Sequence, residues 1–327
     1  MLTLDKLKIV VPSLDCINDI NTNKFNTITK KGIITEYKHQ QVTPYLLYIE
    51  KDIADGEFII EFTGKILGTR YNELINANNI RQCLENVNAL ELCTLDIDRI
   101  LNEGRVVKAD VTIDVAYPDI ASLTRELQAS IINNERYITK NMRGNFIVEK
   151  NVKTANRKLR LTIYDKEHEM NLQENQRWLQ SYDNAEVQNL TNYFKGKIRF
   201  ELNLNSVKAI KDGLCIQDNS VLSVLNAEAN PIMSFIDKIL VDKAEAHAVR
   251  TLRDEERLAL LKANDYNMKA IENIIRLHKA PSTKLSDTIK PYQELYQSLH
   301  ADKSSSLKKR LRNVLLEIFL VGFFVLI

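Results

Sequence analysis

Glycine and proline are scarce in this chain, at 9 and 6 of 327 residues, and no internal repeat or low-complexity tract interrupts it. Cysteine is also scarce, with four widely scattered residues that form no CxxC pair and have no histidine nearby at metal-ligand spacing. The sequence therefore offers no zinc-binding motif, and its cysteine usage favours a reducing cytoplasm.

The chain also lacks an excess of either charge. Lys and Arg total 45 against 43 Asp and Glu, which leaves a formal net charge of +2. Global electrostatics therefore do not indicate a polyanionic partner, and any nucleic-acid surface must be a local patch. The length allows one large domain or two modest ones, each with its own core, and we expect two.

No apolar run is long enough to cross a membrane. Residues 1–11 alternate charged and apolar side chains, which predicts a strand and not a secretory signal. Residues 314–327 are apolar apart from Glu317 and Gly322 and follow a basic stretch, but a spanning helix needs about 20 residues. Two interpretations stay open for this tail: a membrane-surface or truncated anchor, or a buried terminal helix.

Alternating and helical patterns follow one another along the first two thirds of the chain. Period-two alternation predicts strands, and apolar residues at helical spacing predict helices. Strands are expected at residues 4–11, 44–50, 57–66, 105–117, 145–149, 159–164 and 197–205, and helices at 71–92, 120–133 and 166–179. The strands at 145–149 and 159–164 are joined by a basic turn and read as a hairpin.

From about Asn219 onward the strand signals vanish and helical periodicity dominates. The order of elements predicts an α+β fold, with an antiparallel sheet and helices on one face, followed by a smaller all-helical C-terminal domain. We expect the domains at residues 1–218 and 219–300, and a basic then apolar tail at 301–327.

Three of the predicted strands carry polar side chains on one face. Alternation sends the apolar residues of each strand one way and the polar residues the other way. The polar set comprises Lys108, Asp110, Thr112 and Asp114, then Arg160, Thr162, Tyr164 and Lys166, and finally Arg199, Glu201 and Asn203. A solvated sheet face carries such residues too, so periodicity alone supports only an α+β domain with an acidic and basic sheet face.

The same residues fall in three ordered motifs. They are Val-Lys-Ala-Asp-Val-Thr-Ile-Asp at 107–114, Leu-Thr-Ile-Tyr-Asp-Lys-Glu-His-Glu at 161–169 and Ile-Arg-Phe-Glu at 198–201. In this order they resemble the replication initiators of filamentous phages, of the gene II and gene X type, and the related plasmid initiators. The resemblance spans roughly residues 109–225.

The resemblance implies a role for each matching residue. The nucleophilic tyrosine falls on Tyr164 and its partner lysine on Lys166. The metal-binding carboxylates fall on Asp110, Glu169 and Glu201, with Asp114 on the same face as a further ligand. The basic residues expected to contact DNA are Arg157, Lys158, Arg160 and Arg199.

An initiator of this type nicks one strand of origin DNA to start rolling-circle replication. Mg²⁺ or Mn²⁺ held by carboxylates polarises the scissile phosphate, and the tyrosine hydroxyl attacks and keeps the 5′ phosphate as an ester. The free 3′ hydroxyl then primes a polymerase. The implied partners are single-stranded or supercoiled origin DNA and a host helicase and polymerase. The implied location is the host cytoplasm, with membrane association left open by the tail.

The sequence departs from the family pattern at two points, and it also lacks the paired-histidine metal motif of many rolling-circle enzymes. The arginine before the first motif is Lys108, and no tyrosine follows the third motif, so Tyr193 is kept as a reserve nucleophile. The five histidines form no His-x-His pair, which leaves carboxylates as the metal ligands, with His168 as a further candidate.

A second hypothesis is an origin-binding replication protein that does not cut DNA. It rests on residues 263–278, where a short polar segment separates two apolar-periodic helices, as in a helix-turn-helix. The same pattern also fits an ordinary helical hairpin. A structural or membrane-associated protein is a third hypothesis, which rests on the apolar tail alone.

Overall fold

The computed structural model describes residues 2–117, 119–130, 137–142, 144–150, 159–240, 249, 251–264, 266–278, 280, 282, 284–301 and 307–324. Its centre is a ten-stranded antiparallel sheet of order β3-β4-β5-β6-β1-β8-β12-β11-β10-β9. In chain order the strands are β1 (Leu4–Val11), β3 (Phe25–Lys30), β4 (Ile33–His39), β5 (Leu46–Asp52), β6 (Glu57–Thr63), β8 (Arg105–Ala116), β9 (Tyr137–Met142), β10 (Asn145–Lys150), β11 (Leu159–Asp165) and β12 (Lys197–Leu204). A separate two-stranded sheet joins β2 (Ile17–Asn18) and β7 (Thr94–Leu95).

Helices connect these strands and follow them. The short 3-10 helices are η1 (Leu14–Cys16), η2 (Thr22–Lys24) and η3 (Gly64–Glu73). The α-helices are α1 (Ile80–Asn88), α2 (Ile97–Glu103), α3 (Ile120–Ser130), α4 (Lys166–Met170), α5 (Gln173–Leu179), α6 (Asn184–Phe194), α7 (Val207–Leu214), α8 (Val221–Leu225), α9 (Pro231–Ile239), α11 (Leu252–Ala263), α12 (Met268–His278), α13 (Leu285–Ala301) and α14 (Leu307–Phe324). The expected α+β class, with an antiparallel sheet and a helical C-terminal region, is confirmed.

One face of the sheet is apolar and buried beneath helices. Leu7, Ala109 and Leu204 lie opposite one another on β1, β8 and β12, and all three are fully buried. Helix α7 packs over Leu204, and Gly104 at the end of α2 lies against Ile9 and against Val221 of α8. This is the core face that the alternation of the strands predicts.

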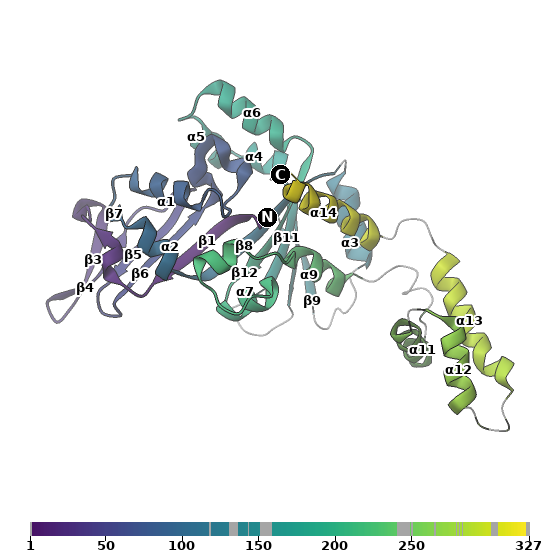
Figure 1. The fold of residues 1–327 in the computed structure, drawn as a ribbon. Helices are drawn as coiled ribbons and strands as arrows, with labels where there is room; N and C mark the ends of the chain where they lie inside the picture. Colours follow the sequence, from purple (N-terminus) through teal and green to yellow (C-terminus); the bar gives the residue numbers. More distant parts are fainter. Residues whose placement is uncertain are drawn as a thin grey trace. The chain divides into compact units, whose positions relative to one another are not determined.

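The opposite face of the sheet carries the polar residues, and helices cover one end of it as well. Tyr71 of η3 and Lys166 of α4 both hydrogen-bond to groups over this face. Figure 1 shows α4, α5 and α6 on the side of the sheet opposite α7 and α9. These helices therefore partly enclose the polar face. Polar side chains at that end of the sheet form hydrogen bonds with residues of the covering helices.

A β-bulge in the first strand adds two residues to the polar face. The pairing of β1 with β8 shifts between Leu4 and Lys6, so Asp5 lies outside the regular alternation. Asp5 and Lys6 both contact polar-face residues, whereas Leu4 and Leu7 are fully buried. Bulges commonly redirect side chains in this way beside functional sites.

The chain divides into two compact units. The first contains Met1–Thr124, Asn133–Phe235 and Leu315–Ile327, and the second contains Arg125–Ile132 and Ile236–Val314. Helix α8 and the first part of α9, up to Phe235, belong to the first unit, although they follow residue 218. Helix α8 is held there by buried Val221 and by a bridge between Ser220 and Arg105.

The second unit has its own small core. Helices α11, α12 and α13 bury a shared cluster of Leu261, Ile271, Ile275, Ile289 and Leu295. The turn between α11 and α12 includes Tyr266 in the left-handed region at φ 57°, and the amide N–H of Tyr266 donates to the Leu261 carbonyl oxygen. The segment expected to resemble a helix-turn-helix is thus two helices that meet in a short turn against a third.

Helix α14 contains the basic part of the tail and the beginning of its apolar part. Leu307, Leu311 and Leu315 are buried and lie four residues apart, on one face of the helix. Among the described residues, no helix has both the length and the apolar content that a membrane span requires. Residues 325–327 of the tail lie outside the described part of the chain.

Gly68 is the glycine whose replacement we expect to be most informative. Its φ is +63°, and an added Cβ would lie 2.8 Å from Cε1 of Tyr182. Gly196 has a similar φ of +65°, but an added Cβ there would meet nothing within 4 Å.

Because Gly68 has φ 63° and ψ −128°, a combination that residues with a Cβ rarely adopt, we expect Gly68→Ala to destabilise the protein by ~1–3 kcal/mol for the backbone and by ~1–3 kcal/mol more for overpacking. Gly196→Ala should show the backbone cost alone. Urea unfolding of the two variants measures the difference in their free energies of unfolding. Equal losses of unfolding free energy would contradict close packing of the Tyr182 ring against Gly68.

Candidate active site

The three sequence motifs lie on neighbouring strands of the sheet. Strand β12 pairs with β8 on one side and with β11 on the other. The register places Arg199 beside Asp114 and Tyr164, which forms one row of the polar face. Two further rows run parallel to it: Thr112, Glu201 and Thr162, and then Lys6, Asp110, Asn203 and Arg160.

Arg199 is the most completely buried charge of this face, with a side chain that is 0% exposed. Its guanidinium binds both oxygens of Asp114, with Nε–Oδ1 and Nη2–Oδ2 distances of 2.6 and 2.8 Å. Nη1 donates to Asp5 at 2.8 Å and to the Tyr71 hydroxyl at 2.6 Å. The role of Arg199 in this structure is therefore internal, and it does not lie exposed to a DNA strand.

Tyr71 connects Arg199 to Lys166. The Tyr71 hydroxyl donates to Asp5 at 2.6 Å and accepts from Lys166 Nζ at 2.9 Å, in addition to the bond from Arg199. Burial, together with the nearby charge of Arg199, lowers the pKa of Lys166 to about 8. Lys166 is therefore mostly charged at neutral pH but loses its proton more readily than an exposed lysine.

Glu169 accepts hydrogen bonds from a cluster of donors. Its Oε2 lies 2.5 Å from Lys166 Nζ, and its Oε1 lies 2.8 Å from Asn175 Nδ2 and 3.6 Å from Lys65 Nζ. Lys65 also donates to Asn175 Oδ1 at 2.7 Å. Although burial opposes it, the charge of Lys166 holds the pKa of Glu169 below its usual value. Glu169 therefore fixes Lys166 in position.

Tyr164 contacts a different carboxylate. Its hydroxyl donates to Glu201 Oε2 at 3.3 Å, and Glu201 Oε1 accepts from Asn203 Nδ2 at 3.0 Å. Burial raises the pKa of Glu201 to about 7, with a further contribution from neighbouring Asp110. Burial also raises the pKa of Tyr164 well above its usual value. Tyr164 is thus a neutral phenol hydrogen-bonded to a carboxylate that titrates near neutrality.

Asp110 lies beside this pair. Its Oδ2 is 2.6 Å from Lys6 Nζ, and its buried Oδ1 has no hydrogen-bond partner among the residues that the structure describes. Burial raises the pKa of Asp110 above its usual value. An unpaired buried carboxylate oxygen costs free energy unless a cation or water satisfies it.

The expected metal ligands do not form a single group. Over the described residues, no three His, Cys, Asp or Glu side chains lie close enough to hold one ion. Arg199 neutralises Asp114, and Lys166 with Lys65 neutralises Glu169. Asp110 pairs with Lys6 through Oδ2, whereas its Oδ1 has no hydrogen-bond partner among the described residues, and Glu201 accepts hydrogen bonds from Tyr164 and Asn203.

The remaining predicted residues differ in their surroundings. Arg157 and Lys158 lie outside the described residues. Arg160 is exposed, and its Nε donates to Asn203 Oδ1 at 2.8 Å. Tyr193 packs beneath Lys197, whose Nζ is 3.1 Å from the ring centroid, and burial raises the pKa of Tyr193 to about 12. His168, the further candidate for a metal ligand, is exposed.

Sequence patterns did not predict four residues of this cluster: Asp5, Lys65, Tyr71 and Asn175. Tyr71 falls in a segment whose spacing suggested one continuous helix from residue 71 to 92. The chain instead breaks at Leu74, which has φ 54°, and α1 begins at Ile80. Asp5 could have been found only from the bulge, which period-two alternation does not reveal.

No protein-family model matches the sequence, and no curated protein is similar to it at a significant level. The resemblance to phage and plasmid initiators therefore rests on the three motifs and their order.

The raised pKa of Glu201 predicts a pH-dependent change in stability. In the unfolded chain this carboxyl loses its proton near pH 4.5, but in the folded protein it does so only near pH 7. The folded state is thus penalised increasingly as the pH rises from about 4.5 to 7, by ~1–3 kcal/mol in total.

We therefore expect Glu201→Gln to match the wild type near pH 4.5 and to be the more stable protein above pH 7. Urea unfolding across this range, in EDTA to remove cations, measures the difference. Exposed Glu228→Gln is the control and should track the wild type throughout. A constant offset between Glu201→Gln and the wild type would contradict the shifted titration.

Proposed function

We propose that this protein is a DNA replication initiator of the rolling-circle type, which nicks one strand of origin DNA through a covalent link to Tyr164. The observation that carries the proposal is the hydrogen bond from the Tyr164 hydroxyl to the Glu201 carboxylate, on the sheet face where three initiator-like motifs meet. A nucleophile paired with an adjacent base is the usual arrangement for covalent catalysis.

The chemistry begins at the Tyr164 oxygen. Its proton passes to Glu201, and the phenolate oxygen attacks the phosphorus of a phosphodiester. The bond from phosphorus to the 3′ oxygen breaks, and that oxygen takes up a proton from solvent. The 5′ phosphate remains esterified to Tyr164, so the energy of the broken bond is kept for rejoining. Reversal of the same steps seals the strand.

Lys166 supplies positive charge close to the nucleophile. Its Nζ lies 5.7 Å from the centre of the Tyr164 ring and is held by Tyr71 and Glu169. A cation that is already positioned stabilises the charge of the transition state without reorganising, and it does so most strongly where water is partly excluded. Lys166 is itself buried, which supports this role.

A divalent cation fits at Asp110 and Glu201. Asp110 Oδ1 is the buried oxygen that lacks a partner, and Glu201 lies on the next strand of the same face. Bound there, Mg²⁺ or Mn²⁺ would neutralise charge on the phosphate. Single-stranded or supercoiled origin DNA would be the substrate, and a host helicase and polymerase would use the nicked product in the host cytoplasm.

An origin-binding protein without nicking activity is the second candidate. Helix α12 begins after Asn267, whose Oδ1 accepts from the backbone N–H groups of Lys269 and Ala270, and its exposed surface includes Lys269 and Arg276. Such a helix after a short turn can enter a major groove. Binding of this kind leaves supercoiled plasmid closed, whereas a nickase relaxes it in the presence of Mg²⁺.

The nucleophile can be tested with a random-sequence pool of single-stranded DNA labelled at the 3′ end. Attack that retains the 5′ phosphate transfers this label to the protein, whereas a 5′ label is released. We expect a labelled protein band on a denaturing gel with Mg²⁺ or Mn²⁺, and no such band in EDTA. Tyr164→Phe should still bind the pool but form no adduct.

Tyr193→Phe is the matched control and should form the adduct at the wild-type level. An adduct that persists in Tyr164→Phe and is lost in Tyr193→Phe would move the nucleophile to Tyr193. An adduct that persists in both variants would exclude tyrosine catalysis at these positions. Binding without any adduct in the wild type would favour the second candidate.

A further inference from the structure

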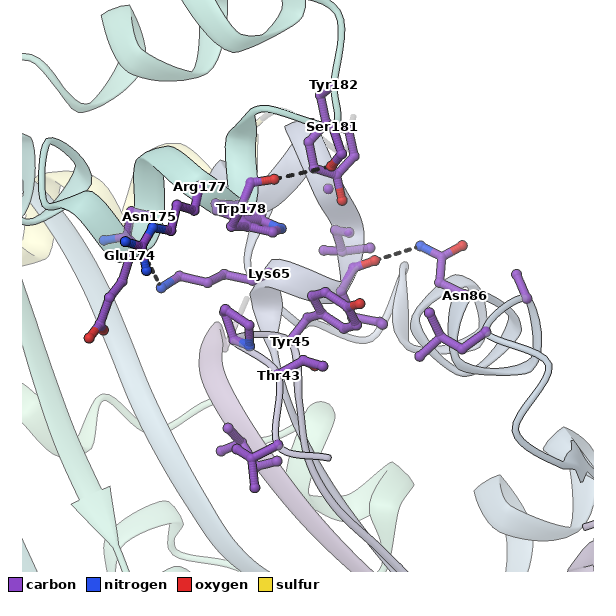
Figure 2. A pocket seen from close by; sticks show the side chains of 18 residues that line it. Thr43, Tyr45, Lys65, Asn86, Glu174, Asn175, Arg177, Trp178, Ser181 and Tyr182 are labelled. Atoms are coloured by element: carbon purple, nitrogen blue, oxygen red, sulfur yellow. Dashed lines mark hydrogen bonds between the residues drawn. The ribbon is translucent and has the colours of Figure 1, made fainter. Parts of the chain in front are cut away.

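A cavity of about 960 Å³ opens beside the Lys166 cluster. It is bounded by the segment before β5, by η3, by the end of α1 and by α5 with the residues that follow it. Figure 2 shows its labelled lining, which includes the aromatic residues Tyr45, Trp178 and Tyr182. The volume is ample for a nucleotide-sized ligand.

The aromatic side chains that line the cavity are fixed by packing against neighbouring residues. Trp178 packs edge-on against Tyr71, with ring centroids 5.7 Å apart, and against Tyr182 at 6.0 Å. Tyr182 lies so close to Gly68 that a side chain there would clash with its ring. Rings fixed by their neighbours lose little entropy when a flat ligand stacks on them.

The charged side chains that line the cavity are Lys65, Arg177 and Glu174, a net charge of +1. The Lys65 ammonium lies 5.7 Å from the Trp178 ring centre, and Figure 2 shows its hydrogen bond to Asn175. Arg177 is exposed. Aromatic faces next to cations are the combination that binds a base together with its backbone phosphate.

The cavity is also close to the reacting groups. Lys65 Nζ is 3.6 Å from Glu169 Oε1, and Glu169 Oε2 is 2.5 Å from Lys166 Nζ. A single carboxylate therefore separates a cation that lines the cavity from the cation beside Tyr164. A nucleotide bound in the cavity would therefore be close, along the same DNA strand, to a phosphate bound at Tyr164.

We propose that this cavity binds a nucleobase turned out of single-stranded DNA, stacked on Tyr45, Tyr182 or Trp178, with its phosphate at Lys65 or Arg177. The inference rests on the proposed function, because it makes the substrate a single strand whose bases are free to turn outward. It adds a site that binds one nucleotide of that DNA strand and so positions a phosphate of the strand at Tyr164.

The chain has one tryptophan, and it lines this cavity, so intrinsic fluorescence reports on stacking there. The full-length protein is titrated in EDTA with a mixed-sequence oligonucleotide of about 12 nucleotides, within the range of known single-strand sites. We expect saturable quenching. An oligonucleotide of equal length with abasic sites throughout should bind more weakly and leave the fluorescence unchanged.

Tyr182→Leu removes a stacking face but keeps an apolar side chain, and we expect it to weaken oligonucleotide binding by about 5- to 150-fold. Tyr182→Phe keeps the face and should bind like the wild type. Tyr45→Leu, at the opposite part of the lining, provides a second test if Tyr182→Leu does not fold. Loss of binding in a Leu variant with recovery in the Phe variant would support the proposal.

Several outcomes would overturn it. They are oligonucleotide binding, measured on filters, without quenching; equal quenching by the abasic strand; and quenching by deoxynucleoside monophosphates as tight as by the oligonucleotide. The last result would indicate a site for free nucleotides. Quenching without any adduct would overturn the nickase while leaving the base site, and an adduct without quenching would do the reverse.

Discussion

The buried guanidinium of Arg199 is the constraint on which the polar face depends. Removing such a charge from water costs several kcal/mol, so the fold must supply partners for each of its donors. It does so from three separate parts of the chain: Asp114 on β8, Asp5 at the bulge of β1 and Tyr71 of η3. The position of η3 over the sheet follows from this requirement, and because Tyr71 also accepts from Lys166, so does the position of α4.

Pairing within the face sorts its carboxylates into two kinds. Asp5, Asp114 and Glu169 are each bound by an arginine or lysine that is almost fully buried, and they serve to hold those cations. Asp110 and Glu201 differ from these: Asp110 pairs with partly exposed Lys6 through one oxygen while its other oxygen has no hydrogen-bond partner among the described residues, and the hydrogen bonds described for Glu201 come from the neutral donors Tyr164 and Asn203. The proposed chemistry uses these two carboxylates, Glu201 to take a proton and Asp110 with Glu201 to hold a cation.

Much of the fold follows from local sequence patterns, whereas the site follows from them only in part. Alternation in 105–117 and 197–205 predicts which side chains share a face, because the period of a strand is two. It cannot predict that Arg199 is buried, since burial depends on η3, whose Tyr71 comes from a segment with helical spacing. Nor can it predict Asp5, which faces this site only because the register of β1 shifts by one residue. Glu169 is a local partner of Lys166, three residues further along the chain, but its other partner, Tyr71, lies 95 residues away, where no local pattern connects the two.

The three tyrosines near Lys166 and Arg199 differ in the hydrogen bonds and the exposure of their side chains. The Tyr71 oxygen already donates to Asp5 and accepts from both Arg199 and Lys166, and its side chain is 1% exposed, so no phosphorus atom can approach it. Tyr193 lies under Lys197, on the helix that leads into β12. Tyr164 is half-buried, and its hydroxyl donates a hydrogen bond to Glu201, a carboxylate that can take its proton. Among the described contacts of these three tyrosines, Tyr164 combines a partly exposed side chain with a hydrogen bond to a carboxylate, and this combination supports its choice as the proposed nucleophile.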